Sequence, residues 1–157
     1  MNMQHDPVHH PAHYTVYPVE PIDITRHLGF CLGNAVKYVL RAPYKGGEED
    51  CRKALQYLEW EGETRQPPVT LQAYTRISET LEELQAYLVS EGDALWDDIS
   101  GAQSDFLTTL DAYLHQDSSV CRMEEHVEEL ARILALRDRH DPVYADCTGL
   151  PTAREER

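Results

Sequence analysis

The chain has 157 residues, a length that fits one domain or one domain with an appendage. Hydrophobic residues make up 41% and charged residues 27%, which is ordinary for a globular protein and excludes wholesale disorder. The formal net charge is −14 at pH 7. A protein that coats nucleic acid or lies on anionic lipid needs a positive field, so this charge argues against long nucleic acid and a membrane surface as partners.

The negative charge is unevenly distributed along the chain. Residues 1–65 carry 7 basic and 9 acidic side chains, a net charge of −2, whereas residues 66–136 carry 3 basic and 14 acidic side chains, a net charge of −11. All three lysines lie in the first part. We therefore divide the chain into a domain at 1–65 and an acidic helical extension at 66–157, and expect the two to pack as one unit.

The sequence predicts a cytoplasmic protein. No stretch approaches the roughly 18 consecutive apolar residues of a membrane-spanning helix. The first residues also lack the basic and apolar regions of a secretory signal peptide. We therefore expect no membrane partner.

The front part of the chain predicts an irregular arm followed by short helices. Residues 1–20 contain three prolines, which favour extended, irregular backbone. A short helix is expected over 21–29, since proline suits a first helical turn. The next helix is expected over 30–42, where apolar residues recur at helical spacing until Pro43. A third helix is expected over 48–62, because its three leading acids suit the positive end of the helix dipole.

The back part contains no proline from Val69 to Asp141, which permits long helices. Thr70 can cap a helix whose apolar residues form a heptad-like seam up to Leu88. Two more helices are expected, one carrying apolar residues from Leu95 to Tyr113 and one carrying them from Val120 to Leu134, and an irregular tail is expected from about Asp141. No strand-like alternation competes, so the predicted fold is all-α. We expect the irregular arm and short helices to be followed by a three-helix, antiparallel, bundle-like segment with acidic outer faces.

The front also contains three motifs in a fixed order. They are His-Pro-x-His-Tyr at 10–14, Gly-Asn-Ala-x-Lys-Tyr-x-x-Arg-Ala at 33–42, and Lys-x-Gly at 45–47 continued by Asp-x-x-Lys-Ala-x-x-Tyr-Leu at 50–58. Their order and spacing, over about residues 9–61, resemble a phage domain family of unknown function that includes a small nucleotide kinase without a P-loop. The sequence at 70–140 resembles no family that we can name.

The resemblance implies a phage-encoded, nucleotide-binding protein of the bacterial host cytoplasm, similar to a P-loop-less (deoxy)nucleoside monophosphate kinase and assembled as a homo-oligomer. The chain lacks Gly-x-x-x-x-Gly-Lys-Ser/Thr, so a Walker-type phosphate cradle is excluded. If the protein is an enzyme, we expect a nucleotide phosphotransferase that uses Mg²⁺, with Asp50 as the candidate metal or base group. No protein-built metal site is predicted from the histidines or cysteines.

The spacing of the basic residues allows them to meet at one ligand. Lys37 and Arg41 are four residues apart, and so project from one helical face. Lys53 lies on the next helix, four residues before Tyr57. Lysine and arginine can bind phosphate, tyrosine rings can stack on a base, and histidine can donate to phosphate or transfer a proton. The predicted nucleotide-binding residues are His10, His13, Tyr14, Asn34, Lys37, Tyr38, Arg41, Lys45, Lys53 and Tyr57.

Other interpretations of the same residues stay open. Lys37 and Arg41 can instead pair with the acids at 48–50 on the solvent face, and Tyr38 and Tyr57 can be core aromatics. The protein can be a sponge that sequesters a cyclic or other nucleotide signal of bacterial immunity without catalysis. It can also be a metal-dependent, all-α nucleotide pyrophosphatase that uses the acids at 124–129. The seam ending at Leu88 can be buried in a homo-oligomer as readily as within the chain.

Overall fold

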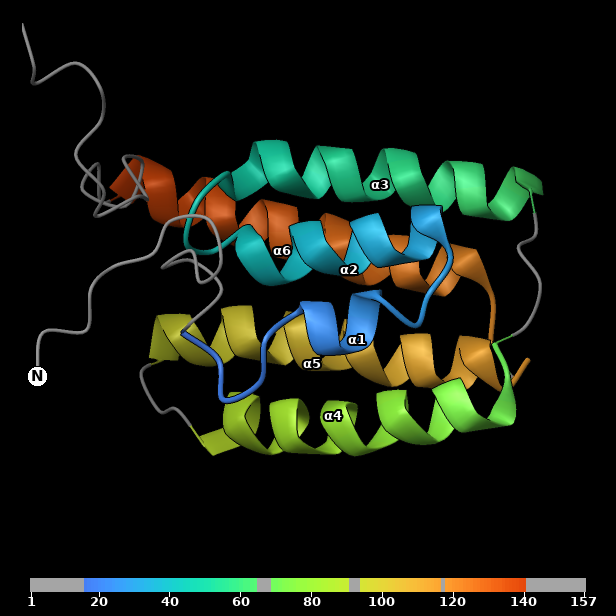
Figure 1. Ribbon diagram of the computed structural model, residues 1–157. Helices are drawn as coiled ribbons and strands as arrows, with labels where there is room; N and C mark the ends of the chain where they lie inside the picture. The colour runs from blue at the N-terminus through green and yellow to red at the C-terminus, as the bar shows by residue number, and fades with distance from the viewer. Residues whose placement is uncertain (1–15, 65–68, 91–93, 117, 141–157) are drawn as a thin grey trace, which may run out of the picture.

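A computed structural model of the chain describes residues 16–64, 69–90, 94–116 and 118–140. Within these ranges it consists of helices and contains no strand (Figure 1), which confirms the all-α prediction. The helices are α1 (Ile22–Thr25), α2 (Phe30–Arg41), α3 (Gly47–Thr64), α4 (Leu71–Ser90), α5 (Ala94–Leu114) and α6 (Val120–His140). Most of the predicted arm and the whole predicted tail lie outside the described residues.

The boundaries of most helices follow the local signals in the sequence. α2 ends two residues before Pro43, and the backbone N–H of Ala73 donates to the Thr70 hydroxyl at the start of α4 (3.2 Å). α1 is shorter than predicted. Its continuation is tightened by i→i+3 hydrogen bonds at His27 and Leu28, which end the α-helical pattern before α2 begins.

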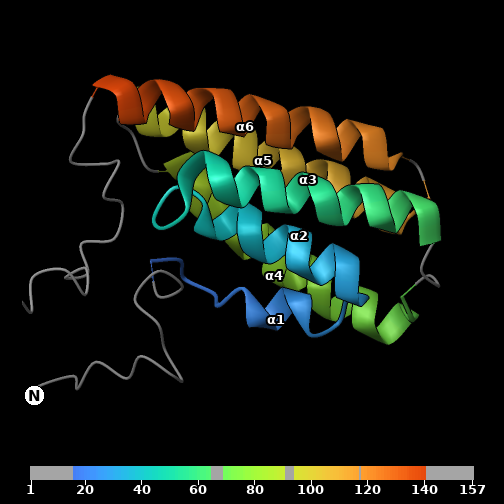
Figure 2. The same cartoon turned by 90° about the horizontal axis from the view of Figure 1, so that it is seen from above.

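The helices pack side by side as a closed ring. In order around the ring, the principal contacts join α1 to α2, α2 to α3, α3 to α6, α6 to α5, α5 to α4, and α4 back to α1. The five long helices alternate in direction, as the colours in Figures 1 and 2 show. α4, α5 and α6 therefore form the expected antiparallel, bundle-like segment. α6 also packs along α3, so the front helices belong to the same bundle.

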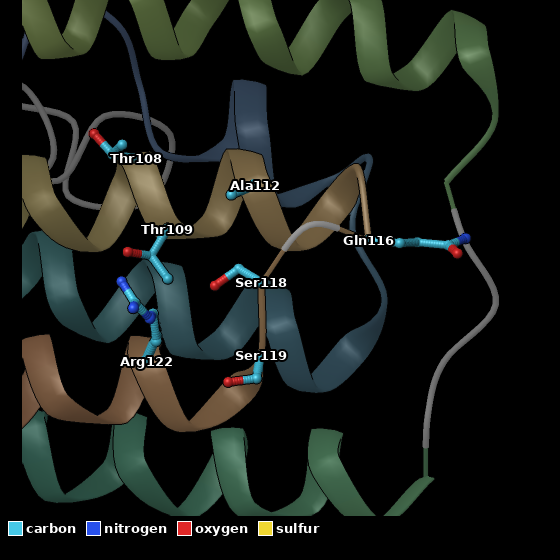
Figure 3. Close-up of a pocket in the computed structure, with 7 residues that line it drawn as sticks. All are labelled: Thr108, Thr109, Ala112, Gln116, Ser118, Ser119 and Arg122. Carbon is cyan, nitrogen blue, oxygen red and sulfur yellow. The ribbon is translucent and has the colours of Figure 1, made fainter.

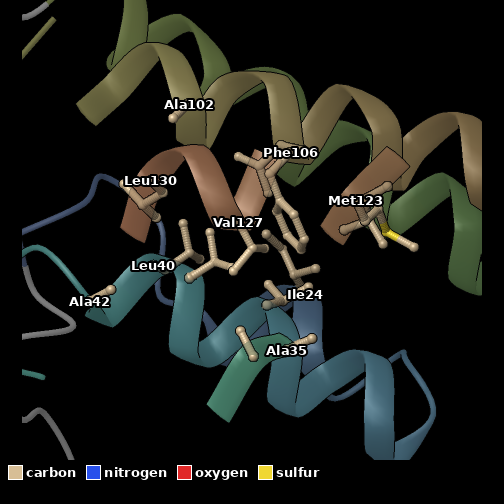
Figure 4. Packing of buried hydrophobic residues seen from close by; sticks show 14 of the residues in the cluster. Ile24, Ala35, Leu40, Ala42, Ala102, Phe106, Met123, Val127 and Leu130 are labelled. Carbon is tan, nitrogen blue, oxygen red and sulfur yellow. The ribbon is translucent and has the colours of Figure 1, made fainter. Parts of the chain in front are cut away.

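One hydrophobic core fills the ring, and all six helices contribute to it (Figure 4). The predicted seam on α4 is buried within the chain, and Ile77 and Leu84 are fully inaccessible to solvent. This seam is therefore not a free surface for a second copy, and the homo-oligomer stays a prediction. The acidic outer faces are confirmed by exposed residues on each back helix, including Glu82, Asp105 and Glu128.

Buried hydrogen bonds attach the front of the chain to the back helices. The Tyr17 hydroxyl donates to the Leu40 carbonyl (2.7 Å) and accepts from the Gln103 side chain (3.0 Å), which connects the segment before α1 to α2 and α5. Arg137 on α6 donates to the carbonyl of Pro43 in the α2–α3 turn (2.8 Å). These contacts fix α2 and the turn that follows it against the bundle.

Among the described helices, none has the combination of length and apolar character that crossing a membrane requires.

Candidate functional site

Three of the predicted cations converge on one aromatic ring at the surface shared by α2 and α3. The Lys37 Nζ atom lies 4.4 Å from the centroid of the Tyr38 ring, and the Arg41 Cζ atom lies 4.8 Å from it. Lys53 approaches from α3, with its Nζ atom 5.7 Å from the same centroid. Cations at these distances are attracted by the electron-rich face of the ring. The packing of α2 against α3 thus collects the charges that the sequence places on separate helices.

Arg41 is bound to the buried carboxylate of Asp50. Its Nε and Nη2 atoms each donate to one Asp50 oxygen at 2.8 Å, and the Asp50 side chain is only 1% exposed. A Cβ atom on Gly46 would lie 2.1 Å from the Asp50 Cγ atom, so a side chain at that position would displace the carboxylate. Both Asp50 oxygens are used by Arg41, and Asp50 therefore acts in this geometry as a positioning residue for the guanidinium group.

Lys37 has neutral partners. Its Nζ atom donates to the Asn34 side-chain oxygen (2.7 Å), and the Asn34 amide in turn donates to the Phe30 carbonyl (2.8 Å). Within the described residues Lys37 forms no ion pair. Arg41 therefore pairs with one of the acids at 48–50, but that acid is buried and does not lie on the solvent face, whereas Lys37 pairs with no acid in the part of the chain that the structure describes.

Lys53 forms an exchangeable ion pair at the surface. Its Nζ atom lies 2.8 Å from a Glu49 oxygen and 3.8 Å from Asp50. The hydrogen bond between Lys53 and Glu49 lowers the pKa of Glu49 and raises the pKa of Lys53. Exposed pairs of this kind contribute little to stability, so an incoming anion can replace Glu49 at small cost.

Three further aromatic rings, those of Tyr57, Phe30 and Trp60, continue the site from Tyr38 away from the cations. The Tyr57 ring is stacked on Tyr38, with centroids 5.9 Å apart and an interplanar angle of 17°. Phe30 and Trp60 contact the Tyr57 ring at steep angles, with centroids 5.8 and 5.4 Å away. Sequence reasoning did not select Phe30 or Trp60. Their spacing could have identified them, since Trp60 follows Tyr57 by three residues and Phe30 precedes Asn34 by four.

The remaining predicted residues are not part of this arrangement. Lys45 is exposed in the α2–α3 turn, and no contact of its side chain with the other candidates occurs among the described residues. His10, His13 and Tyr14 lie outside the described residues. The set that the structure brings together, which we call the α2–α3 cluster, comprises Asn34, Lys37, Tyr38, Arg41, Asp50, Lys53 and Tyr57.

The acidic residues proposed for a pyrophosphatase lie apart from the α2–α3 cluster, on α6. Glu125, Glu128 and Glu129 are exposed there, and Glu129 pairs with Arg132. The part of the chain that the structure describes contains no group of three or more His, Cys, Asp or Glu side chains arranged to hold a metal ion. The string at 124–129 thus has the geometry of a solvated helix face.

A polar pocket of about 670 Å³ lies between the end of α5 and the start of α6 (Figure 3). The hydroxyl groups of Thr109, Ser118 and Ser119 and the guanidinium group of Arg122 line it, while Gln116 extends away from them. Sequence reasoning did not predict this pocket, because its residues form no recognisable motif and meet only where the two helices adjoin.

Comparison with known proteins identifies only the front segment. Residues 8–59 match the model of a family described as a protein of unknown function, DUF3310. The matched segment spans α1, α2 and most of α3, and so includes every residue of the α2–α3 cluster. No curated protein and no solved structure matches the chain significantly.

Proposed function

We propose that the protein binds a nucleoside phosphate at the α2–α3 cluster and acts as a P-loop-less (deoxy)nucleoside monophosphate kinase. The observation that supports this proposal is the convergence of Lys37, Arg41 and Lys53 around the Tyr38 ring, next to the stacked ring of Tyr57. Phosphate oxygens accept charge-assisted hydrogen bonds from such cations, and an aromatic surface beside them suits a base. The order of motifs in the front segment supports the kinase activity by resemblance.

The three cations differ in how they would act on the phosphates. Lys37 has neutral partners, so it makes the primary contact without losing an ion pair. Lys53 exchanges Glu49 for a phosphate oxygen. Arg41 stays bound to Asp50, which holds its charge in a fixed place beside the other two. A local cationic site of this size suits a small anion, whereas the acidic back of the chain disfavours a long polyanion.

Phosphoryl transfer is compatible with a site made of cations. An oxygen of the monophosphate attacks the γ-phosphorus of a triphosphate, and the bond from that phosphorus to the β–γ bridging oxygen breaks. Two diphosphates form in equal amounts, and no protein nucleophile takes part. Such catalysis depends on positioning and charge stabilisation. The described residues do not fit a dedicated Mg²⁺ site, since both Asp50 oxygens are bound to Arg41, and Mg²⁺ enters this proposal only with the nucleotide.

One observation favours a second candidate, a sponge that holds a nucleotide signal unchanged. The candidate base, Asp50, is buried and bound to Arg41 through both of its oxygens. A binding protein needs the cations and the aromatic rings but no catalytic group. The pyrophosphatase has no comparable support, because Glu125, Glu128 and Glu129 on α6 are exposed and the described residues contain no acidic group arranged to hold a metal ion.

Nucleotide analysis tests the proposal. The purified protein is incubated with ATP, a panel of monophosphates and cyclic nucleotides, and Mg²⁺, and the nucleotides are separated after the protein is denatured by heat. Equal amounts of ADP and a new diphosphate support the kinase. Unchanged nucleotide recovered from a tight complex supports the sponge and overturns catalysis. Release of monophosphate and pyrophosphate supports the pyrophosphatase, and the absence of any binding overturns the whole proposal.

Substitutions test whether the nucleotide binds at the α2–α3 cluster. Lys37→Ala removes one charge-assisted contact and should weaken nucleotide binding by roughly 10- to 100-fold in calorimetry. The matched control is Arg76→Ala, which removes an exposed cation from α4, three positions away from α3 in the ring. This control should bind normally. Equal affinities of the wild type and Lys37→Ala would show that the ligand binds elsewhere.

A further inference from the structure

Two large aromatic side chains next to the α2–α3 cluster are exposed to solvent. Phe30 is 72% exposed and Trp60 is 44% exposed, whereas the core takes apolar residues from every helix. They are not isolated, because both rings contact Tyr57, at interplanar angles of 73° and 83°. Exposed aromatic groups gathered around one ring are typical of a binding surface.

Charge and aromatic groups are separated along this pair of helices. α2 begins with Phe30 and ends with Arg41, whereas α3 runs in the opposite direction and carries Lys53 near its start and Trp60 near its end. The cations therefore lie at one end of the pair and the exposed rings at the other. The last turn of α3 has no basic residue, and the exposed Glu59 and Glu63 flank Trp60. A phosphate is disfavoured at that end.

The separation along each helix fits one nucleotide. Phe30 precedes Lys37 by seven residues, and Lys53 precedes Trp60 by seven. At about 1.5 Å per residue, each cation lies about 10 Å along the axis from the exposed ring on its own helix. A ribose with one or two phosphates spans this separation between a base and a lysine. Inorganic phosphate is too short to span it.

We propose that Phe30, Tyr57 and Trp60 form the base subsite of the α2–α3 cluster, so that the ligand is a nucleoside phosphate with its base packed against this group of rings and its phosphates on the lysines. The proposal rests on the proposed function, since it assigns the second half of the same ligand. The aromatic faces of this subsite would recognise the base by stacking. Purine nucleotides, with the larger ring system, should therefore bind more tightly than pyrimidine nucleotides.

Leucine substitutions test this base subsite. Trp60→Leu and Phe30→Leu keep apolar bulk and remove the aromatic ring, and each should weaken binding of a purine nucleotide by roughly 5- to 150-fold. Inorganic pyrophosphate, used as a probe of the phosphate half alone, should bind these variants as it binds the wild type. Trp60→Phe and Phe30→Tyr retain a ring and should bind the nucleotide almost normally, which separates stacking from a folding defect.

Fluorescence gives an independent measurement. The chain has two tryptophans, and in a Trp96→Phe background Trp60 is the remaining one. Stacking of a base on Trp60 should quench its emission on addition of nucleotide but not on addition of pyrophosphate.

The outcomes distinguish this inference from the proposed function. If nucleotide binds and Lys37→Ala weakens it while both leucine variants bind normally, the base subsite is wrong and the proposed function stands. If the wild type binds no nucleotide, both fail. If Trp60→Leu changes the mass measured by light scattering and leaves nucleotide affinity unchanged, the exposed rings form an interface between copies, and the base subsite is overturned.

Discussion

Removing the carboxylate that holds Arg41 should destabilise the whole fold. In Asp50→Ala, Arg41 loses two hydrogen bonds of 2.8 Å and keeps a charge that is only 17% exposed. Breaking a buried pair by deleting one partner costs about 3–5 kcal/mol. Because Arg41 can recover some hydration through its exposed part, we expect a loss of about 2–4 kcal/mol in the free energy of unfolding.

Urea unfolding followed by circular dichroism measures this loss. With a denaturant slope of about 2 kcal/mol per molar, the midpoint should fall by roughly 1–2 M. Glu48→Ala is the matched control, because it breaks an Arg–Glu pair of the same 2.8 Å length, between Arg52 and Glu48, that is exposed on both sides. That control should cost less than about 1 kcal/mol.

A double-mutant cycle with Arg41→Met isolates the pair itself. Arg41→Met leaves the buried Asp50 carboxylate without its arginine partner, and Asp50→Ala then removes that charge, so Asp50→Ala should cost much less in the Arg41→Met background than in the wild type. We expect the two substitutions to be non-additive by about 1–3 kcal/mol. If the effects of Asp50→Ala and Arg41→Met add within about 0.5 kcal/mol, the view that burial makes this pair strong is refuted. It is also refuted if the urea midpoint of Asp50→Ala equals that of Glu48→Ala.

Three further predictions concern two buried groups, the Tyr17 hydroxyl and the Cys51 thiol. Tyr17→Phe leaves the buried Leu40 carbonyl and the Gln103 amide without the hydroxyl between them, so urea unfolding should show a loss of about 1–3 kcal/mol. Burial raises the pKa of the Cys51 thiol to about 12, so in a Cys147→Ser variant at pH 8 a thiol reagent should modify exposed Cys121 quickly and Cys51 only on unfolding. As the pH rises, the unfolded chain releases the Cys51 proton before the folded state does. The free energy of unfolding should therefore fall as the pH rises from about 9 towards 12. A urea midpoint that stays constant over that range would contradict this prediction.

The helices were predictable because their signals are local. Pro43 and Thr70 mark boundaries through the geometry of their own backbone or side chain, and the apolar spacing on α4 identifies its buried face. The length of α1 was not predictable in this way. The tight turn after Thr25 depends on how the chain returns to begin α2, which is a tertiary effect.

The candidate site was predictable only in part, because spacing places residues on a face without giving their partners. The positions of Lys37, Arg41 and Lys53 on facing helices followed from the sequence. Which of the three acids at 48–50 pairs with Arg41 did not follow from the sequence. Asp50 can reach Arg41 because Gly46 has no side chain in the space that the Asp50 carboxylate occupies. The helical spacing places Trp60 beside Tyr57 on α3, but the contact between Phe30 on α2 and Tyr57 on α3 joins two helices, and no single-helix pattern contains it.

The ring of helices has a consequence for any protein that contains only the front segment. Here α3 buries its apolar face against α6, and α1 packs on α4, so the back helices supply one wall of the core that α2 and α3 need. A chain that ended after α3 would leave Leu58 and Ile24, both inaccessible to solvent in this structure, open to water. It would have to cover them with a second copy or with another protein. Helices α4, α5 and α6 thus supply, within one polypeptide, the packing that a shorter chain would have to obtain through assembly.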